Sequence, residues 1–577
     1  MSLSGAPVVE RRNAMLDGNP EGRDDVPFPP REGCRVQALV EAAEMFPALE
    51  RLVLGAEESV WLAFRIFDPD TRVHSDEARA LGLSTWVDVL RHVVRRGVQV
   101  RFLLADFEPV LADHLHAGSW RAFQRLRELL EEIGEADAER LEVMVVQHDG
   151  EVGAAWRQLL RPLIRRRVRR TVEQLVAQRE PEDGGMRTRP GLWRYATWEG
   201  EDASGWQAGA PPRLWPATYH QKFAVADRRV AVLGGIDVDE RRWDNQRHRQ
   251  RADQTWHDIS ARLDGPAAGD VAEHFRRLWN AELPRYRRIV GEWTRGAGRK
   301  LLLDPLDAIA PATRPVPEAG SATVQVLRTL SKPARGPFAI GPRPHVRELK
   351  AAHRQMILSA AHTLYIEAQF FRSVEAGRWV RTALERNPAL EVIVLIANTP
   401  EEIAFEGQGS NPAHKHGEWL QARVLGNLLR RGGPRFGLFT LVKQESVRPD
   451  ERAFDASRGT AFGAGVIHIH SKLLIADDES CLLSSANING RSFDWDTELG
   501  ILWREGGDAV GAFRRRLWAQ LWGDALGEHA GLAEWRAAAR ENAEAKPEER
   551  RGFVVPYQLA RARRYGRPNW FVPDDLV

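Results

Sequence analysis

The sequence predicts an α/β protein of two repeated α/β sandwich domains, each a mixed sheet flanked by helices, related by a pseudo-twofold axis. Three observations predict this fold. Strand-like and helix-like segments alternate in the first half, the same order returns in the second half, and each copy ends in the same short motif. Such alternation is typical of parallel or mixed sheets covered by helices. At 577 residues, the chain is long enough for two domains.

The composition is that of an ordinary globular protein. Lys and Arg number 82 against 80 Asp and Glu, which gives a net charge of +2, and 43% of the residues are hydrophobic. Proteins that neutralise many phosphates usually carry a basic excess, so we expect no nucleic-acid partner. Cys34 and Cys481 lie in opposite halves without the spacing of a zinc or redox site, which fits a reducing, cytoplasmic compartment.

The first residues show no targeting segment. Residues 1–32 are rich in Pro, Gly and charge, and they predict an extended leader without the apolar core of a secretory signal. No apolar stretch reaches the length of about 18 residues that a membrane-spanning helix needs. We therefore expect no transmembrane segment and at most peripheral contact with a membrane.

The first copy belongs to a predicted domain at 33–300. Its helices show apolar residues at helical spacing, and its strands are short runs rich in β-branched and aromatic residues. The expected elements are a strand at 34–39, a helix at 42–57, a strand at 60–67, a helix at 84–96 and a strand at 98–106.

An insertion at 151–215 interrupts this copy. Residues 156–179 predict a basic, partly amphipathic helix, and 180–215 a polar loop rich in Gly and Pro. The helix would either touch anionic lipid headgroups or pack on the domain, and we favour packing. Pro162 predicts a helix start near Arg161. The side chains expected to pack are Leu159, Leu160, Leu163, Ile164 and Val168.

The second copy follows a proline-dense segment at 301–345, which predicts a linker and the start of the repeat. The second domain is expected at 346–530 and a C-terminal tail at 531–577. The expected elements are a strand at 322–327, a helix at 346–360, a strand at 364–371, a helix at 378–386 and a strand at 390–398.

Each copy ends in the pattern H-x-K-x-x-x-x-D. Residues i and i+2 of a strand point to one face, so each histidine projects with its lysine. Pseudo-twofold symmetry would bring two imidazoles and two ammonium groups to one cavity, a chemistry suited to a phosphodiester. Because of their odd spacing from the lysines, the aspartates are expected to be structural. The candidate catalytic residues are His220, Lys222, Asp227, His470, Lys472 and Asp477.

The residues after each motif fit the same site. Small side chains at Gly235 and Ser485 would let a phosphate oxygen approach, and the amide of Asn487 can donate a hydrogen bond to it. Asp244 or Glu498 could hold the second ring nitrogen of its histidine, as a carboxylate does in a catalytic triad.

A metal site is the alternative for the second motif, because His468 and His470 share a strand face. Lys472 on that face disfavours a divalent cation, and no nearby Cys or carboxylate completes a ligand set. We therefore expect no metal and no cofactor. His257 and Asp258 are expected to support the first half of the site.

The two motifs resemble the HKD motifs of the phospholipase D superfamily. The resemblance extends to GGIDVDERRWD, TWHDISARLDGPAA, LYIEAQFF and SSANINGRSFDWDTE, and it covers residues 33 to 527. It implies a bilobal phospholipase D fold and a phosphohistidine intermediate. His220 would attack phosphorus, and His470 would protonate the leaving alcohol and then activate water or an acceptor alcohol. Lys222, Lys472 and Asn487 would bind the non-bridging oxygens, and Asp237 departs from the family by replacing a second Asn.

The implied activity is hydrolysis of glycerophospholipids to phosphatidic acid and free headgroup, with transfer of the phosphatidyl group to alcohols. The enzyme would work as a monomer on phospholipid at a membrane surface. Three alternatives remain: a cardiolipin-synthase-like phosphatidyltransferase, a superfamily nuclease and a non-catalytic scaffold. The first normally carries N-terminal membrane helices, the second often carries one motif per chain, and the third would have lost a motif residue. The headgroup and the acyl preference stay open.

Overall fold

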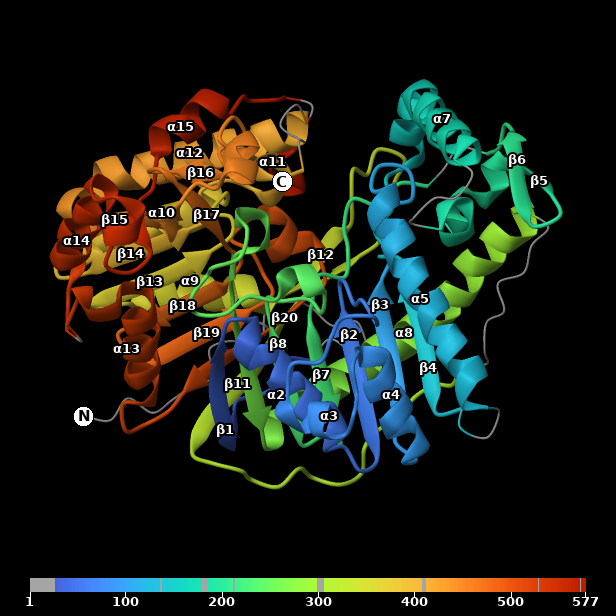
Figure 1. The fold of residues 1–577 in the computed structure, drawn as a ribbon, viewed down its shortest axis with the longest axis horizontal. Helices are drawn as coiled ribbons and strands as arrows, with labels where there is room; N and C mark the ends of the chain where they lie inside the picture. The colour runs from blue at the N-terminus through green and yellow to red at the C-terminus, as the bar shows by residue number, and fades with distance from the viewer. Residues whose placement is uncertain are drawn as a thin grey trace.

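The computed structural model describes residues 26–577 except 135–136, 138, 179–183, 211–212, 298–305, 407–410, 528 and 571. Figure 1 shows a large mixed sheet with helices packed against it, which confirms the predicted α/β class. The first 25 residues of the expected leader lie outside the described residues, and the first strand already begins at Arg31.

The sheet of the first half contains β1 (Arg31–Val40), β2 (Ser59–Phe64), β3 (Gln99–Ala105), β4 (Leu141–Val146), β7 (Phe223–Ala226), β8 (Val230–Gly234) and β10 (Ile259–Asp264). Their order in space is β4-β3-β2-β7-β8-β10-β1. The pairs among β2, β3 and β4 are parallel, and the other pairs are antiparallel.

The sheet of the second half repeats this order. It contains β11 (Ala322–Lys332), β13 (Thr363–Ala368), β14 (Glu391–Ile396), β15 (Phe436–Ser446), β18 (Lys472–Ala476), β19 (Ser480–Ser484) and β20 (Glu498–Arg504). The order in space is β15-β14-β13-β18-β19-β20-β11, again with three parallel strands at one side. Each strand therefore has a counterpart in the first half.

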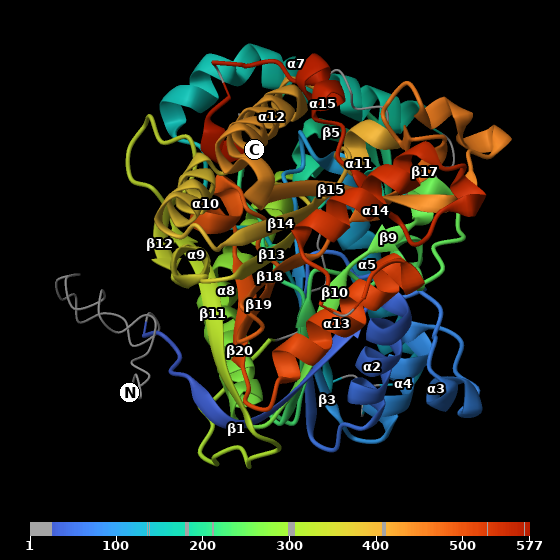
Figure 2. The ribbon, with the colours of Figure 1, turned by 90° about the vertical axis from the view of Figure 1, so that its left-hand side faces the viewer.

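The two sheets join through β1 and β11, which pair antiparallel with Cys34 opposite Ala322. Figure 2 shows β1, β11 and β20 side by side at this junction. One hydrophobic cluster includes residues of both halves, for example Val232 and Leu483. The halves therefore share a core, which fixes the relative position of their equivalent strands.

Helices cover both faces of the first sheet. In β2, Trp61 stacks on Phe275 of α8, whereas Phe64 faces Phe67, which contacts Trp86 of α4. Alternate side chains of one strand thus contact helices on opposite faces, as the strand period requires. The helices of this half are α2 (Ala42–Leu54), α3 (Asp76–Ala80), α4 (Trp86–Arg95), α5 (Asp113–Ile133) and α8 (Pro266–Ala297).

The second half continues beyond the expected tail boundary. Residues 531–577 contain α14 (Leu532–Glu544), β21 (Val554–Pro556) and α15 (Leu559–Tyr565), and β21 pairs with β15. This segment extends the second sheet instead of trailing from it. The other elements here are β12 (Arg343–Arg347), α9 (Glu348–Ser359), α10 (Val374–Arg386), α11 (Glu401–Ala404), α12 (Pro412–Gly432), β16 (Thr460–Ala461), β17 (Ala464–Ile469) and α13 (Ala509–Trp522).

The insertion forms a small unit with its own core. It contains α7 (Ala154–Ala177), two short 3-10 helices at 185–188 and 190–195, and a hairpin of β5 (Ala196–Glu199) and β6 (Asp202–Trp206). The expectation of a polar loop at 180–215 is therefore wrong for the described part. Ile164, Val168 and Val172 of α7 pack in its core, with Leu192 and Trp193.

The start of α7 also differs from the expectation, because Pro162 lies inside the helix. Proline removes one hydrogen bond within a helix, and the first four N–H groups of any helix need outside partners. Here the chain at 337–339 supplies two such partners: Gly153 N donates to Ala339 O (2.6 Å) and Ala155 N to Pro337 O (2.8 Å). These contacts stabilise the turns that precede the proline.

Three of the five side chains expected to pack from this helix do not. Ile164 and Val168 are buried, but Leu159, Leu160 and Leu163 are 68%, 39% and 72% exposed. No helix among the described residues has both the length and the apolar character that crossing a membrane requires.

Candidate active site

The two motif histidines precede equivalent strands. His220 and Lys222 lie directly before β7, while His470 precedes β18 and Lys472 is its first residue. The two motifs lie close enough for their charges to interact, because Lys472 lowers the pKa of His220 and Lys222 lowers that of His470. The structure thus brings the two motifs together at one site.

The backbone of each motif crosses to the other half. His220 N donates to Thr497 O (2.9 Å), and His470 N donates to His257 O (2.8 Å). The second contact extends a short parallel pairing between β17 and β9 (Trp256–His257). Thr497 and His257 are equivalent positions, because each directly precedes a buried carboxylate, Glu498 or Asp258.

These two carboxylates hold the histidines. His220 Nδ1 lies 3.0 Å from Glu498 Oε1, and His470 Nδ1 lies 2.7 Å from Asp258 Oδ2. Glu498 begins β20 and Asp258 directly precedes β10, which is the equivalent strand. Each histidine is therefore oriented by a carboxylate from the opposite half. Glu498 takes the orienting role expected for it, but on His220 of the first motif and not on the histidine of its own motif.

The expectation for Asp244 is wrong. Its carboxylate accepts hydrogen bonds from His248 Nδ1 (2.8 Å) and Trp256 N (2.9 Å), away from both motif histidines. Asp258 orients a histidine instead. It holds His470 of the second motif, whereas it was expected to support the first half of the site. An alignment of residues 255–265 with residues 495–505, as two copies of one strand, would have matched Asp258 with Glu498. That match would have identified Asp258 as an orienting carboxylate.

Gly235 and Ser485 are also equivalent, and both lie behind the orienting carboxylates. A Cβ at Gly235 would lie 2.5 Å from Asp258 Oδ1. The Ser485 hydroxyl donates to Glu498 Oε2 (2.5 Å) and accepts from Leu499 N (3.1 Å). The small residues predicted to contact phosphate therefore serve a carboxylate instead. Gly235 leaves room for Asp258, and Ser485 donates a hydrogen bond to Glu498.

The lysines concentrate positive charge between the histidines. Lys222 Nζ donates to His220 O (2.5 Å) and lies 3.9 Å from Asp237 Oδ2, while Lys472 Nζ donates to His470 O. Burial lowers the pKa of Lys222, and it lowers that of Lys472 to about 7 even though Asp258 opposes the shift. Both ammonium groups are desolvated donors ready for an anion.

Asn487 and Asp237 make the two halves of the site unequal. Asp237 Oδ1 accepts from Ile66 N (2.8 Å), and its second oxygen faces Lys222. Asn487 is 5% exposed, and its Oδ1 has no hydrogen-bond partner among the described residues. The phosphate-binding role of Asn487 stays a prediction.

Hydrogen bonds define the tautomer of His220. Its Nδ1 also lies 3.1 Å from Ser485 O, a carbonyl that can only accept, so this nitrogen carries the proton. Nε2 is then the free lone pair. Burial, followed by the charges of Lys222 and Arg65, lowers the pKa of His220 well below 6.5. Burial and Lys472 do the same for the pKa of His470.

The sequence did not indicate the arginines around the site. Arg65 and Arg491 lower the pKa of His220 through their charge, and Arg242 contributes likewise at His470. Arg242 also stacks on the Trp256 ring at 3.8 Å and pairs with Glu401. In a chain so rich in arginine, none of them carries a motif that could have marked it.

The motif aspartates lie outside the site, as their spacing suggested, and are not catalytic. Asp227 accepts hydrogen bonds from the N–H groups of residues 57, 58 and 59, and Asp477 from those of 361, 362 and 363. Both aspartates adopt a positive φ, of 49° and 55°. Each carboxylate closes the turn before a central strand of its sheet.

We expect Asp227→Asn to reduce stability and to leave the chemistry intact. Asparagine tolerates a positive φ but cannot accept all three hydrogen bonds, so the free energy of unfolding should fall by about 2 kcal/mol. Urea unfolding measures this change. A loss of turnover per folded molecule, with unchanged stability, would contradict the structural role.

A buried ionic network supports Asp258. His257 Nδ1 lies 2.7 Å from Glu41 Oε1 and its Nε2 lies 3.0 Å from Glu367 Oε2. Despite burial, these two carboxylates raise the pKa of His257 well above 6.5, so both nitrogens donate. His257 therefore links the β1–α2 junction to β13 of the second half and fixes the backbone beside Asp258.

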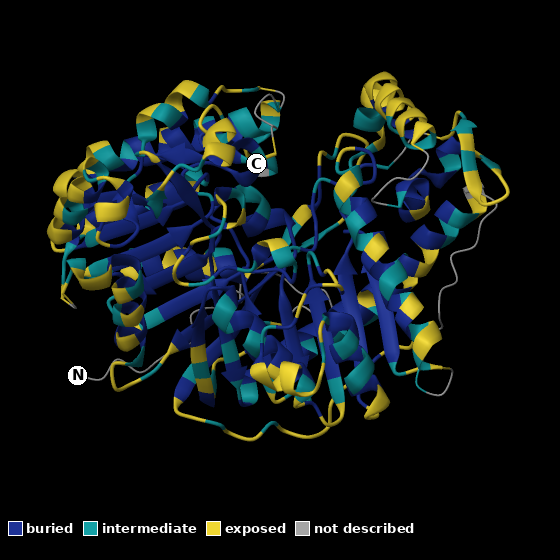
Figure 3. Cartoon of the chain, in the orientation of Figure 1, coloured by how far each residue is buried: buried dark blue, intermediate teal, exposed yellow. Residues whose placement is uncertain are grey.

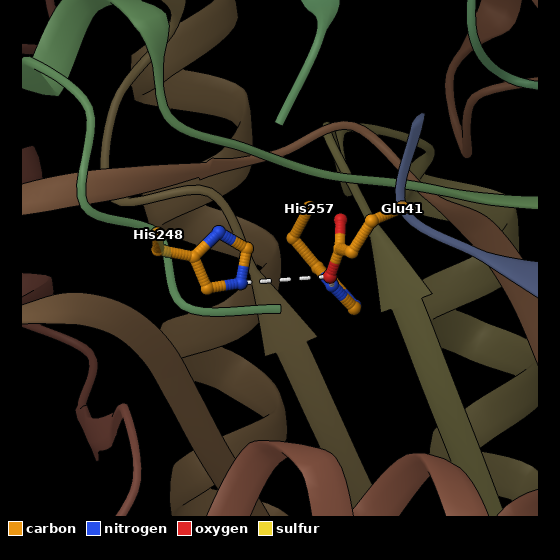
Figure 4. Close-up of side chains that lie close together, drawn as sticks. All are labelled: Glu41, His248 and His257. Carbon is orange, nitrogen blue, oxygen red and sulfur yellow. Dashed lines mark hydrogen bonds and ion pairs between the residues drawn. The ribbon is translucent and has the colours of Figure 1, made fainter. Parts of the chain in front are cut away.

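Three residues of this network have the spacing of metal ligands. Figure 4 shows His248 and His257 directed at the carboxylate of Glu41, with His248 Nε2 3.5 Å from Glu41 Oε1. Both ring nitrogens of His257 are bound to carboxylates through their protons, so no lone pair is left for a cation. The group acts as an ion-pair network. His468 is buried and makes an edge-on contact with the Trp256 ring.

Comparison with known proteins finds several phospholipases D among the relatives of this chain. Phospholipase D1 of Homo sapiens is 29% identical over 283 residues, which cover 43% of this chain and 24% of that protein. Phospholipase D alpha 3 of Arabidopsis thaliana is 26% identical and covers 49% of this chain and 44% of that protein. Phospholipase D2 of Bos taurus is 26% identical over 531 residues, 83% of this chain and 50% of that protein. The chain thus spans half or less of the length of these relatives.

Among solved structures, phosphatidylserine synthase of Haemophilus influenzae superposes with a TM-score of 0.49 at 13% identity, over 86% of this chain and 88% of that chain. No protein-family model matches the sequence.

Proposed function

Because the chain belongs to the phospholipase D superfamily, we propose that it hydrolyses glycerophospholipids to phosphatidic acid and a free headgroup. One observation carries the proposal. Two imidazoles are each held at Nδ1 by a carboxylate of the opposite half, which leaves both Nε2 atoms free beside two desolvated lysines. A phosphodiester is the substrate class that needs a nucleophile, a proton donor and two cations together.

The different pKa values of the two orienting carboxylates, Glu498 and Asp258, favour His220 as the nucleophile. Burial raises the pKa of Glu498 to about 8, so at neutral pH it is mostly protonated and stabilises an imidazolium poorly. Burial raises the pKa of Asp258 only to about 6, because Lys472 opposes the shift. The charge of Asp258 can therefore stabilise a proton that His470 takes up, although burial and Lys472 lower the pKa of His470 well below 6.5. In the first step neutral His220 is the nucleophile, and the reactive fraction of the protein is the one in which His470 carries a proton.

In the first step, His220 Nε2 attacks phosphorus, the P–O bond to the headgroup breaks, and His470 gives its Nε2 proton to the leaving oxygen. In the second step, neutral His470 takes a proton from water, the oxygen of that water attacks phosphorus, and the P–N bond to His220 breaks. Lys222 and Lys472 neutralise charge on the non-bridging oxygens in both steps. An alcohol in place of water yields the transfer product.

The acid side of the pH profile tests the state of His220. Since burial and Lys222 lower the pKa of this nucleophile, kcat/KM should fall only at a pH below 6.5, where His220 gains a proton. Lys222→Met removes one of the charges that lower the pKa of His220, so this acid limb should move to higher pH. Steady-state kinetics on a soluble substrate across acidic pH measures both. An acid limb at or above pH 6.5 in the native protein would contradict the assignment.

The proposal itself is tested by incubating the protein with mixed phospholipid vesicles and a short primary alcohol, with products identified by mass spectrometry. We expect phosphatidic acid and the phosphatidyl alcohol, and the released headgroup identifies the preferred lipid. One chain supplies both halves of the site, so activity should be proportional to protein concentration. Intact lipid together with cleavage of nucleic acid would replace this proposal with a nuclease.

A further inference from the structure

Exposed apolar side chains gather around one helix. Among the described residues, nine large hydrophobic side chains are exposed, and six of them lie on α7 or beside it. Figure 3 shows α7 as a mostly exposed helix at the upper right of the molecule. We call these six residues the α7 patch: Leu111, Leu159, Leu160, Leu163, Phe338 and Ile340.

The patch is continuous because the chain holds its parts together. Trp156 Nε1 donates to Phe338 O (2.9 Å), which ties the 336–340 loop to the first turn of α7. Further along the helix, Arg167 Nε donates to Val110 O (2.9 Å), next to Leu111. Residues 156, 160, 163 and 167 form one stripe at helical spacing. The stripe runs from Phe338 past Leu160 and Leu163 to Leu111.

Positive charge borders the same surface. The α7 sequence contains seven arginines and one acidic residue, Glu173, in a protein whose net charge is only +2. Arg166 and Arg170 lie three and seven residues after Leu163, so they continue its face, and both are exposed. Ile164 and Val168 bind the opposite face of the helix to the insertion core. The outer face thus combines exposed leucines with arginines.

The patch is linked to the catalytic site through the same loop. Gly341, next to Ile340, packs against the Trp495 ring (3.0 Å for a Cβ built there) and Pro216 (3.2 Å). Trp495 is three residues before Glu498, and Pro216 is four residues before His220. The surface that carries Phe338 and Ile340 therefore leads directly to the segments that hold the nucleophile.

We propose that the α7 patch docks the protein on an anionic lipid bilayer, with the leucines and Phe338 in the interface and the arginines on the headgroups. The inference rests on the proposed function, because it gives the site access to an insoluble substrate. Apolar burial and charge act together in such docking, and each arginine near an anionic surface strengthens the binding. A purely apolar patch would not explain arginines on the same face.

Flotation of the full-length protein with vesicles tests the docking. We expect binding to phosphatidylcholine vesicles that contain phosphatidylglycerol, and much weaker binding to phosphatidylcholine alone or at high salt. Leu159→Ser with Leu163→Ser, and separately Arg166→Gln with Arg170→Gln, should each weaken binding about 10-fold or more. The controls are Leu81→Ser, at a leucine after α3 that is 53% exposed, and Arg430→Gln, at an exposed arginine of α12.

The two proposals fail in different ways. The patch variants should keep native turnover on a short-chain, monomeric phospholipid and lose it on vesicles. Vesicle binding without any lipid product would overturn the proposed function and leave docking intact. Equal binding of the patch variants and the controls would overturn docking. Docking would also be overturned if the native protein formed a dimer, the leucine variants were monomers, and neither the dimer nor the monomer bound vesicles.

Discussion

Replacement of His220 by asparagine should remove essentially all phospholipid hydrolysis. Asparagine cannot form the covalent bond to phosphorus, and loss of a nucleophile from a coupled set of catalytic groups lowers kcat by at least about 10⁴-fold. His220 holds its position through Glu498, Ser485 and Thr497, and asparagine keeps the backbone contact to Thr497. The fold should therefore survive.

Two measurements make this result specific. The thermal unfolding of His220→Asn should match that of the native protein closely, and His92→Asn, a half-buried histidine on α4, should keep full turnover. Phosphatidic acid release by His220→Asn at a rate within 10-fold of the native rate would remove His220 from the role of nucleophile.

Loss of Asp258, the carboxylate of the first half that orients His470 of the second half, is expected to have the second largest effect. Asp258→Asn replaces the acceptor 2.7 Å from His470 Nδ1 with an amide, which disfavours both the correct tautomer and the imidazolium. The comparable change in a Ser-His-Asp triad lowers kcat by about 10⁴-fold, and we expect about 10² to 10⁴-fold here. KM should change little, because Asp258 is held behind His470 and does not face the substrate.

Two comparisons separate this effect from loss of structure. Asp244→Asn alters a carboxylate equally buried in the same region but bound to His248, so its cost should appear in unfolding rather than in kcat. A leaving group that needs no proton, such as p-nitrophenol, should restore the first step in Asp258→Asn. If kcat fell equally in Asp258→Asn and Asp244→Asn, and p-nitrophenol as leaving group did not restore the first step, the pairing of Asp258 with His470 would be contradicted.

The sequence predicted the parts of the site that depend on local order. The H-x-K spacing, the alternation of strands and helices and the repeat of that order all depend on neighbouring residues, and the structure follows them closely. Glu498 was also predicted to orient a histidine, but its place after the second motif assigned it to His470, and the structure places it on His220.

The pairing of Asp258 with His470 was missed because it depends on long-range geometry. These residues are 212 positions apart, and their contact requires β9 of the first half to pair with β17 of the second half. Asp244 was favoured because it lies closer to the first motif along the chain. Gly235 and Ser485 depend on packing within each half, where their small side chains make room for a carboxylate of the neighbouring strand, Asp258 beside β10 or Glu498 in β20.

The insertion shows a second limit of sequence patterns. Leu159 and Leu163 have helical spacing, which is typical of a packed face, yet the core of the insertion uses the other side of α7. The beginning of α7 depends on carbonyls of residues 337 and 339, more than 180 positions away. Tertiary contacts decided both features.

In the proposed mechanism His220 becomes covalently bound to the phosphatidyl group, and His470 first donates and then accepts the proton. The most direct measurement is intact-protein mass spectrometry of His470→Asn after mixing with a phosphatidyl ester of p-nitrophenol. The leaving group needs no proton, but water is no longer activated, so the adduct should accumulate. We predict one phosphatidyl group per chain, found on the peptide that contains His220. An adduct on any other residue, or steady release of p-nitrophenol without an adduct, would contradict the account.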